Sequence, residues 1–327
     1  MEWLSAALAA PPSRSAVRRL IMAGALRVDG RPARSPAMAI EPGARLQATI
    51  RGGGLVPPPG PSTLDPSRVL FEDAGLIAVD KPAGLPTVAT ADPRRTHLVG
   101  LVQRLLAGRQ SPRDPLPYLG VHQRLDRDTS GVVLFTKDPA VNSALAAQFA
   151  AREVAKTYVA LTARPARLPP SAWRAEASVD PDADGAARTR GRPAVTDFRL
   201  VEALARALVV EARPRTGRKH QIRIHLARAG LPILGDDAYG GAAARRAPRL
   251  MLHAARLELR HPKGDARVGI ESPLPADFES LLARLREEAS PPRRRTRGRR
   301  RAGRGARRAP GGGARGASER RARRGAR

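Results

Sequence analysis

The sequence predicts an α+β protein in three parts: a small N-terminal α/β module, a larger domain built on a mixed, mainly antiparallel sheet, and a disordered basic C-terminal tail. Three observations support this division. Short apolar runs typical of strands dominate the central region, and helical patterns between them are few. A stretch rich in Gly and Pro precedes that region. The final residues contain almost no large apolar side chain.

Changes in composition set the predicted boundaries. Residues 1–51 form the small module, 52–68 the Gly/Pro linker, 69–288 the main domain and 289–327 the tail. The linker combines Gly52-Gly53-Gly54 with a Pro-rich stretch, and such a sequence continues neither a helix nor a sheet.

The N-terminal module is predicted to contain one helix and a few strands. The helix spans 14–23 and begins after Ser13, a residue type that caps helix N-termini. Arg14 and Arg18 lie four residues apart on one face, away from the apolar stripe. The other predicted elements are strands over 26–28 and 46–50 and a tight turn at Asp29-Gly30.

The main domain shows several apolar runs typical of strands and one clear helical pattern. Val141, Leu145 and Phe149 recur every four residues, which predicts a helix packed on the sheet. The predicted strands cover residues 69–73, 76–80, 132–135, 157–161, 207–211 and 252–259.

The chain carries a formal net charge of +29, and both the tail and the rest of the protein contribute to it. The tail alone has 16 Arg and one Glu. A nucleic acid is therefore the first partner to consider. Arg outnumbers Lys by 54 to five, a bias that genomic base composition also produces. The tail suits sequence-tolerant RNA attachment, and a purely solubilising extension fits equally well.

The absence of Cys excludes disulfides, thiolate zinc sites and cysteine nucleophiles. The first residues lack the basic and apolar regions of an export signal, and no run of 18 apolar residues occurs. We therefore expect a soluble cytoplasmic protein without a membrane partner, and a monomer is the simplest state.

The most informative segment is the polar turn 122–131, which leads into the apolar run 132–135. It places Asp126 between Arg124 and Arg127, on a loop supported by a strand, where catalytic groups are common. Taken alone, an aspartate between arginines is more often a structural ion pair than a reactive group.

Two longer strings carry a specific pattern. One is Arg124-Leu125-Asp126 with Thr129-Ser130-Gly131, and the other is residues 216–223 with Gly235-Asp236. Together they resemble the pseudouridine synthases of the large-subunit ribosomal RNA type A group (RluA family), and the resemblance covers roughly residues 70–285. The module ahead of this region resembles the small RNA-binding domain first described in ribosomal protein S four, although an ordinary small α/β domain has a similar pattern.

The resemblance implies isomerisation of uridine to pseudouridine in structured RNA, with ribosomal RNA favoured and transfer RNA as an alternative. It implies no cofactor and no metal. Asp126 matches the essential aspartate, whose carboxylate attacks or stabilises the sugar or the base as the glycosidic bond breaks. Arg223 matches the arginine that pairs with this aspartate. Tyr158 matches the tyrosine that stacks on the uracil and assists proton removal at carbon 5.

Such an enzyme has to turn the uridine out of the RNA stack. The resemblance matches Arg124 to the residue that fills the vacated place, and Leu252 to an apolar residue beneath the base. Lys156 shares a strand face with Tyr158, with Thr157 on the other face, and is a candidate RNA contact. The remaining candidate RNA contacts are Arg14 and Arg18.

Other polar residues near these motifs receive no catalytic role. The family often has His directly before Arg-Leu-Asp, whereas here Gln123 occupies this position and His122 precedes it. We interpret Asp128 as a turn former, although paired carboxylates also occur in glycosidases. His220 and His225 are five residues apart and share neither a helix face nor a strand face, so metal binding by this pair is not expected.

Two other functions stay open at the level of the sequence. A non-catalytic RNA-binding or ribosome-assembly factor keeps the fold, but it does not need the aspartate, the tyrosine and the arginine together. A glycosidase acting on nucleic acid releases free uracil instead of forming pseudouridine.

Overall fold

The computed structural model describes residues 21, 26–33, 40–48, 50–51, 54–55, 63–90, 95–109, 115–179, 191–264 and 266–289. The predicted helix with Arg14 and Arg18 lies outside this described part, apart from Ile21, and so does the chain after Ala289.

A three-stranded antiparallel sheet forms the described part of the N-terminal module. In it β1 (Leu26–Val28) pairs with β2 (Arg31–Pro32) and with β3 (Leu46–Ala48). Asp29 and Gly30 connect β1 to β2 with φ angles of +50° and +75°, as a type I′ hairpin turn requires. The predicted strand over 26–28 and the tight turn are thereby confirmed. The small buried core comprises Ile21, Leu26, Val28 and Ala33.

The predicted linker contains more structure than its composition suggests. A two-stranded antiparallel hairpin is formed by β4 (Ile50–Arg51) and β5 (Gly54–Leu55). Ile50 therefore belongs to a different sheet from residues 46–48, and the prediction of one strand over 46–50 is wrong at its end. The two residues between β4 and β5 are glycines, which short hairpin connections favour.

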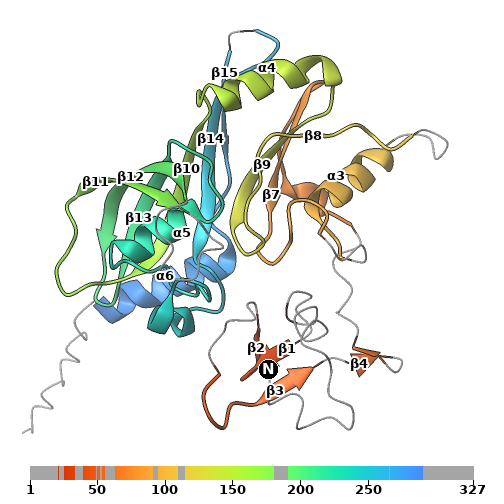
Figure 1. Ribbon diagram of the computed structural model, residues 1–327. Coiled ribbons are helices and arrows are strands. Elements are labelled where there is room, and N and C mark those ends of the chain that lie inside the picture. Colours follow the sequence, from red (N-terminus) through yellow and green to blue (C-terminus); the bar gives the residue numbers. More distant parts are fainter. Residues whose placement is uncertain are drawn as a thin grey trace, which may run out of the picture. The chain divides into compact units, whose positions relative to one another are not determined.

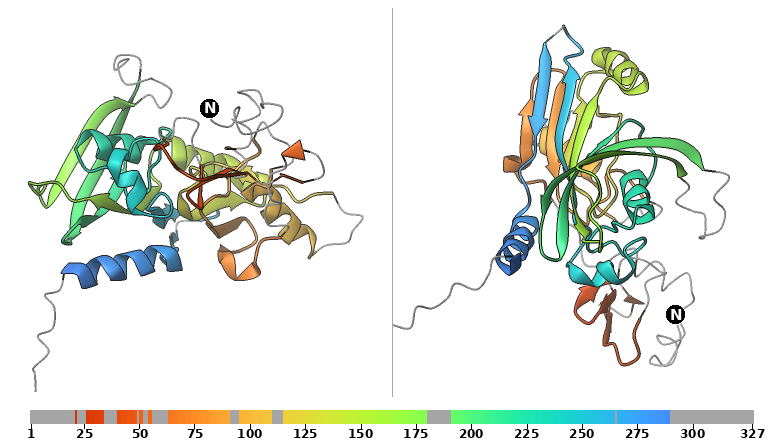
Figure 2. Two further views of the ribbon diagram at one scale, coloured as in Figure 1. Left: turned by 90° about the horizontal axis from the view of Figure 1, so that it is seen from below. Right: turned by 90° about the vertical axis from the view of Figure 1, so that its left-hand side faces the viewer.

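One ten-stranded sheet organises the main domain and confirms the predicted mixed, mainly antiparallel class. Its strands are β6 (Val69–Glu72), β7 (Leu76–Lys81), β8 (Gly120–Val121), β9 (Ser130–Thr136), β10 (Ala155–Ala163), β11 (Ala172–Val179), β12 (Arg192–Ala203), β13 (Ala207–Pro214), β14 (Leu252–Arg260) and β15 (Arg267–Glu271). Their order is β11-β12-β13-β10-β14-β9-β7-β6, with β15 beside β14 and β8 beside β9. At one edge β11 and β12 form a long antiparallel hairpin (Figure 2).

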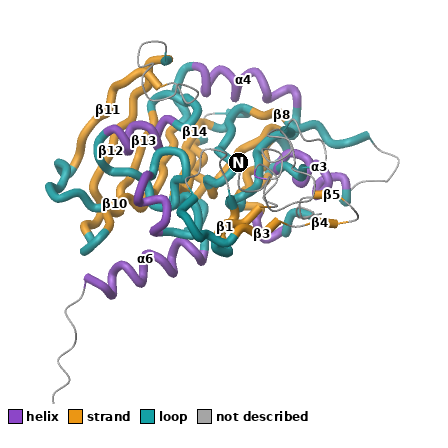
Figure 3. Tube along the Cα trace, turned by 60° about the horizontal axis from the view of Figure 1, so that its bottom comes forward, coloured by secondary structure: helices purple, strands orange, loops and turns teal. Residues whose placement is uncertain are grey.

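Helices are few compared with strands in the described part of this domain (Figure 3). They are α3 (Leu98–Ala107), α4 (Pro139–Ala150), α5 (Gln221–Arg228) and α6 (Ala276–Ala289), with the short 3-10 helices η1 (Pro66–Arg68) and η2 (Gly241–Arg246). Helix α4 confirms the four-residue pattern, because Val141 and Leu145 are buried. Asp138 caps this helix by accepting a hydrogen bond from the Ala140 N–H.

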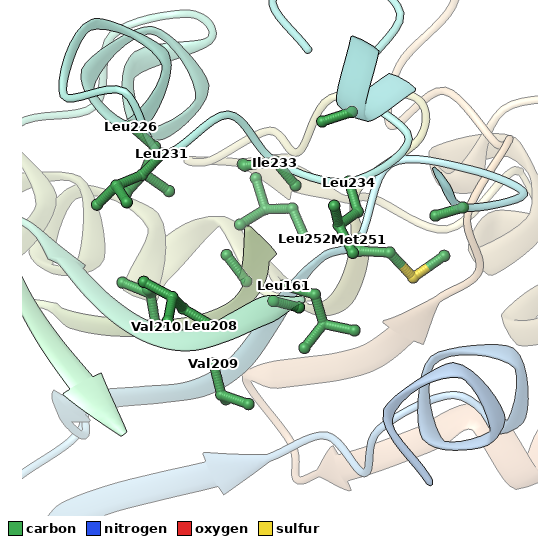
Figure 4. Packing of buried hydrophobic residues seen from close by; sticks show 14 of the residues in the cluster. Leu161, Leu208, Val209, Val210, Leu226, Leu231, Ile233, Leu234, Met251 and Leu252 are labelled. Carbon is green, nitrogen blue, oxygen red and sulfur yellow. The ribbon is translucent and has the colours of Figure 1, made fainter. Parts of the chain in front are cut away.

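Two large hydrophobic clusters fill most of the main domain, and β14 contributes to both. Figure 1 shows β7, β9 and α3 on one side of β14, with β10 to β13 and α5 on the other. Leu252 belongs to the cluster beside α5, whereas Leu257 belongs to the cluster beside α3. Figure 4 shows strand residues Leu161 and Leu208 in the first cluster, together with Leu226 of α5.

The only parallel pair of the described sheet joins β9 to β14 at the centre of the domain. Ser130 lies opposite His253, and Gly131 lies opposite Ala254. Gly131 has φ +117°, and a Cβ there would collide with the Ala254 carbonyl oxygen, so this close approach requires glycine. Because the two strands run in the same direction, the loop before β9 and the segment before β14 lie at the same end of the junction.

Candidate active site

A cleft of about 1370 Å³ contains all the candidate residues of the main domain. This volume exceeds the ~300–1,000 Å³ of an ordinary small-molecule pocket, as expected for a site that receives part of a polymer. The candidate residues that line it are Arg124, Asp126, Lys156, Tyr158, Arg223 and Leu252. Arg14 and Arg18 lie outside the described residues.

The loop that carries Asp126 is held through the backbone of its neighbours. Thr87 Oγ1 donates to the Leu125 carbonyl at 2.9 Å and accepts from the Leu125 N–H at 3.1 Å. On the other side of Asp126, the Arg127 carbonyl accepts a hydrogen bond from Lys81 Nζ at 2.9 Å. The position of Asp126 is thus fixed without using its own carboxylate.

Lys81 lies at the end of β7 and is completely buried. Its Nζ donates to the carbonyls of Pro82, Leu85 and Arg127 at 3.0, 2.8 and 2.9 Å, which satisfies the three N–H groups of an ammonium. Burial lowers the pKa of Lys81 to about 7, although the carboxylates of Asp128, Asp126 and Asp80 oppose the shift. The predicted strand over 76–80 stops one residue before Lys81, and the sequence indicated no role for this lysine.

Arg223 of helix α5 joins two carboxylates. Its Nη1 donates to Asp126 Oδ2 at 3.1 Å, while Nε and Nη2 donate to the two oxygens of Asp236 at 2.8 and 2.7 Å. Asp236 is buried and also accepts from the N–H groups of Ala238 and Tyr239. Burial disfavours the charge on Arg223, but the two carboxylates outweigh burial and raise the pKa of the guanidinium further. Arg223 is therefore a permanent cation beside Asp126.

Tyr158 of β10 packs against both hydrophobic clusters. Burial raises the pKa of its phenol, and the Asp126 carboxylate adds to this increase. The phenol is consequently neutral at neutral pH, a state that can stack on a base or donate a hydrogen bond but does not readily accept a proton. Leu252, buried at the start of β14, supplies an apolar part of the same cleft.

Lys156 and Arg124 provide positive charge to the cleft. The Lys156 Nζ lies 5.8 Å from the centre of the Phe149 ring, and burial lowers the pKa of Lys156. Thr157 does not line the cleft, in agreement with the predicted alternation along the strand. Arg124 is exposed, and its side chain forms no hydrogen bond or ion pair with any residue that the structure describes.

His220 and Tyr239 complete the surroundings of Asp126, and the sequence reasoning did not single them out for this site. His220 Nε2 lies 3.8 Å from Asp126 Oδ2, and its Nδ1 lies 2.9 Å from the Tyr239 hydroxyl. The Tyr239 ring also faces the guanidinium of Arg223, at 5.1 Å from its central carbon. The sequence did contain one indication, because His220 lies three residues before Arg223 in the same motif. The sequence reasoning, however, considered His220 only as a metal ligand.

The remaining polar residues have other partners. Asp128 pairs with Arg127 at 2.8 Å, which suits a structural role, and His122 stacks on Phe149 with ring centres 5.8 Å apart. His225 is buried, with Nδ1 3.0 Å from Thr196 Oγ1. Within the described ranges, no three His, Cys, Asp or Glu side chains are grouped as a metal ion requires. Among the described helices, none combines the length and apolar character needed to cross a membrane.

Comparisons with known proteins agree with this geometry. A family model described as RNA pseudouridylate synthase matches residues 75–228, and an S4 domain model matches residues 3–46. Ribosomal large subunit pseudouridine synthase D of Xanthomonas campestris pv. campestris is 33% identical over 273 residues, which cover 76% of this chain and 80% of that protein. Ribosomal large subunit pseudouridine synthase C of Vibrio cholerae serotype O1 is 34% identical over 233 residues, or 67% of this chain and 69% of that protein.

A solved structure shows the same fold. Human RNA Pseudouridylate Synthase Domain Containing 4 aligns with a TM-score of 0.56 and 26% sequence identity, covering 67% of this chain and 93% of the human chain. The family match includes Asp126, Tyr158 and Arg223 of the cleft. The chain therefore belongs to the RNA pseudouridine synthases, a family of isomerases, and carries an S4 domain at its N-terminus.

Proposed function

We propose that Asp126 is the reacting carboxylate and that the cleft receives a uridine turned out of the RNA stack. The ion pair between Arg223 and Asp126 carries this proposal, because it lies in a cleft that Tyr158 and Leu252 also line. A carboxylate held by an arginine, next to an aromatic ring and an aliphatic side chain, suits a planar uracil attached to a sugar.

The reaction needs no added atoms or electrons. The bond between the sugar carbon 1′ and N1 of uracil breaks, and a bond between carbon 1′ and carbon 5 forms. Carbon 5 loses its proton, and N1 gains one. Asp126 attacks the sugar or the base as the glycosidic bond breaks. If it bonds to carbon 1′, carbon 5 displaces it as the new bond forms; if it adds to the base, it is eliminated once carbon 5 is attached to the sugar.

Tyr158 keeps the detached uracil in place by stacking. The raised pKa of Tyr158 supports a neutral phenol, which suits the stacking role that the resemblance implied better than the assistance in removing the proton from carbon 5. Leu252 supports the base from its buried position on β14. These contacts hold the ring while it rotates between its two attachment atoms.

The basic residues of the cleft contact the RNA itself. Arg124 is exposed and planar, so it can take the place of the extruded base and contact the backbone at once. Lys156 lies on the same strand face as Tyr158 and suits a phosphate near the target nucleotide. Arg14 and Arg18 are further proposed contacts, in the S4 domain.

We propose ribosomal RNA as the substrate, because the relatives are named for the ribosomal large subunit, with transfer RNA as the alternative. We further propose that the protein acts as a monomer in the cytoplasm, where its substrate is made. A single cleft that contains every described candidate residue supports the monomer.

The test is incubation of the purified protein with transcribed large-subunit ribosomal RNA or with transfer RNA, followed by quantification of pseudouridine and free uracil. We expect pseudouridine in the ribosomal RNA and no free uracil. Pseudouridine in transfer RNA alone contradicts the proposed substrate, release of uracil indicates a glycosidase, and binding without any product indicates a non-catalytic factor. Mapping pseudouridines in cells with and without the gene then identifies the position.

A further inference from the structure

His220 has a strained backbone that neither a hairpin turn nor a helix C-terminus explains. Its φ and ψ are +56° and +16°, in the left-handed region, which is unfavourable for a residue other than glycine. The other described non-glycine residues with positive φ have ordinary reasons, since Asp29 lies in a hairpin turn and Arg152 follows the end of α4. His220 instead precedes α5 and makes no capping hydrogen bond. Strain of this kind is retained where a side chain is needed in one place.

The imidazole of His220 lies between a hydroxyl and a carboxylate. Nδ1 is 2.9 Å from the Tyr239 hydroxyl, and Nε2 is 3.8 Å from Asp126 Oδ2. Burial lowers the pKa of His220, with Asp126 opposing the shift, so the ring is neutral and carries one N–H. Because Nε2 faces a carboxylate, the hydrogen belongs on Nε2 and the Tyr239 hydroxyl donates to Nδ1.

The guanidinium of Arg223 and the imidazole of His220 both approach the same oxygen of the Asp126 carboxylate. Arg223 Nη1 donates to Oδ2, and His220 Nε2 also faces Oδ2. Oδ1 has no hydrogen-bond partner among the residues that the structure describes. The carboxylate is therefore held by one oxygen while the other remains available to a substrate.

We propose that His220 is a positioning residue: its Nε2–H, with the tautomer fixed by Tyr239, holds Oδ2 of Asp126 so that Oδ1 meets the target uridine. This inference rests on the proposed role of Asp126. At 3.8 Å the contact is longer than a hydrogen bond, and it tightens when RNA fills the cleft, as catalytic hydrogen bonds commonly do.

Two variants at this position separate the side chain from the backbone. In His220→Gln the side-chain amide reaches the place of Nε2 and still donates to Asp126. In His220→Asn the backbone adopts the left-handed region more easily, but the shorter amide reaches only the place of Nδ1. We expect the Gln variant to keep the single-turnover rate of pseudouridine formation within a few-fold, and the Asn variant to lose roughly 10- to 100-fold. RNA affinity and Tm are measured for both to confirm that binding and folding persist.

Tyr239→Phe supplies an independent readout, because it removes the hydroxyl that fixes the tautomer. We expect a several-fold loss of rate in the wild-type background and no further loss in the His220→Gln background, since an amide has no tautomers. Equal rates for the Gln and Asn variants, whether both normal or both reduced, overturn the inference. Full activity of Asp126→Asn overturns the proposed function itself, so the two failures are distinguishable.

Discussion

Asp236→Asn tests whether a buried carboxylate holds Arg223 in place for Asp126. In the wild type, Asp236 accepts two hydrogen bonds from Arg223, at 2.7 and 2.8 Å, and two more from backbone N–H groups. Asparagine keeps one acceptor oxygen but turns an NH2 group toward the Arg223 Nε–H. That hydrogen bond is lost, and a buried donor is left without a partner.

The expected loss of stability follows from these contacts. A hydrogen bond to a charged group contributes roughly 1.5–3 kcal/mol, and breaking a buried ion pair costs about 3–5 kcal/mol. The two figures describe the same contact and do not add, so we expect the free energy of unfolding to fall by about 3 kcal/mol. For a domain of this size, the Tm then falls by roughly 6–12 °C.

Activity falls for a separate reason, because Arg223 loses one of its two carboxylates and shifts toward Asp126. We expect a single-turnover rate about 10²-fold below wild type at a temperature where the variant is folded. The matched control is Asp277→Asn, which disturbs a second bidentate pair, with Arg249 at 2.6 and 2.7 Å, that does not line the cleft.

The control loses stability but keeps the wild-type rate. Chemical denaturation and pseudouridine formation are measured on both variants under the same conditions. If Asp236→Asn matches Asp277→Asn in rate, Arg223 is not positioned for catalysis by Asp236. If Asp236→Asn loses no stability, the buried pair does not support the fold as argued.

Three further outcomes are expected. Burial lowers the pKa of Lys81 from 10.5 to about 7, so between these pH values the folded protein has lost the Lys81 proton while the unfolded chain still binds it. The stability of wild type relative to Lys81→Met therefore rises as the pH increases from about 7 to 10.5. Chemical denaturation across this range measures the trend, and a decrease in relative stability contradicts the lowered pKa. Gly131→Ala lowers the free energy of unfolding by more than ~2 kcal/mol, because the new Cβ collides with the Ala254 carbonyl. Gly230 also has positive φ but has open space around it, so Gly230→Ala lowers the free energy of unfolding by only about 1 kcal/mol. Equal losses in the two variants argue against the close approach at Gly131. The pKa of the Tyr158 phenol lies above its ordinary value of 10.0 because the side chain is buried. In an alkaline absorbance titration, Tyr158→Phe should therefore leave the amplitude of tyrosine ionisation near pH 10 unchanged. A reduced amplitude near pH 10 contradicts this expectation.

Much of the fold could be predicted because its elements follow local patterns. The apolar runs that became β6, β7, β9, β10, β13 and β14 are each continuous in the sequence, and Val141 and Leu145 mark α4 directly. The pairing of β9 with β14 could not be predicted, since it depends on a contact between Gly131 and Ala254 that is remote in sequence. The β4–β5 hairpin was missed because Gly-rich composition describes linkers and tight turns alike.

The same distinction applies to the site. Asp126 was found through its motif and its loop, both of which are continuous in the sequence. Lys81 was missed because its importance lies in reaching the carbonyl of Arg127, 46 residues away. His220 was missed because its partners, Asp126 and Tyr239, come from two other segments that only the fold brings together. Long-range contacts of this kind leave no periodic signal.

The most direct test of the account is Asp126→Asn, which preserves the size of the side chain and removes its charge. Arg223 and the backbone contacts of the loop still hold the residue in place, so RNA affinity should stay close to wild type. We predict that single-turnover formation of pseudouridine is abolished in the ribosomal RNA that the wild type modifies. Pseudouridine formation at the wild-type rate contradicts the central claim that this carboxylate performs the reaction.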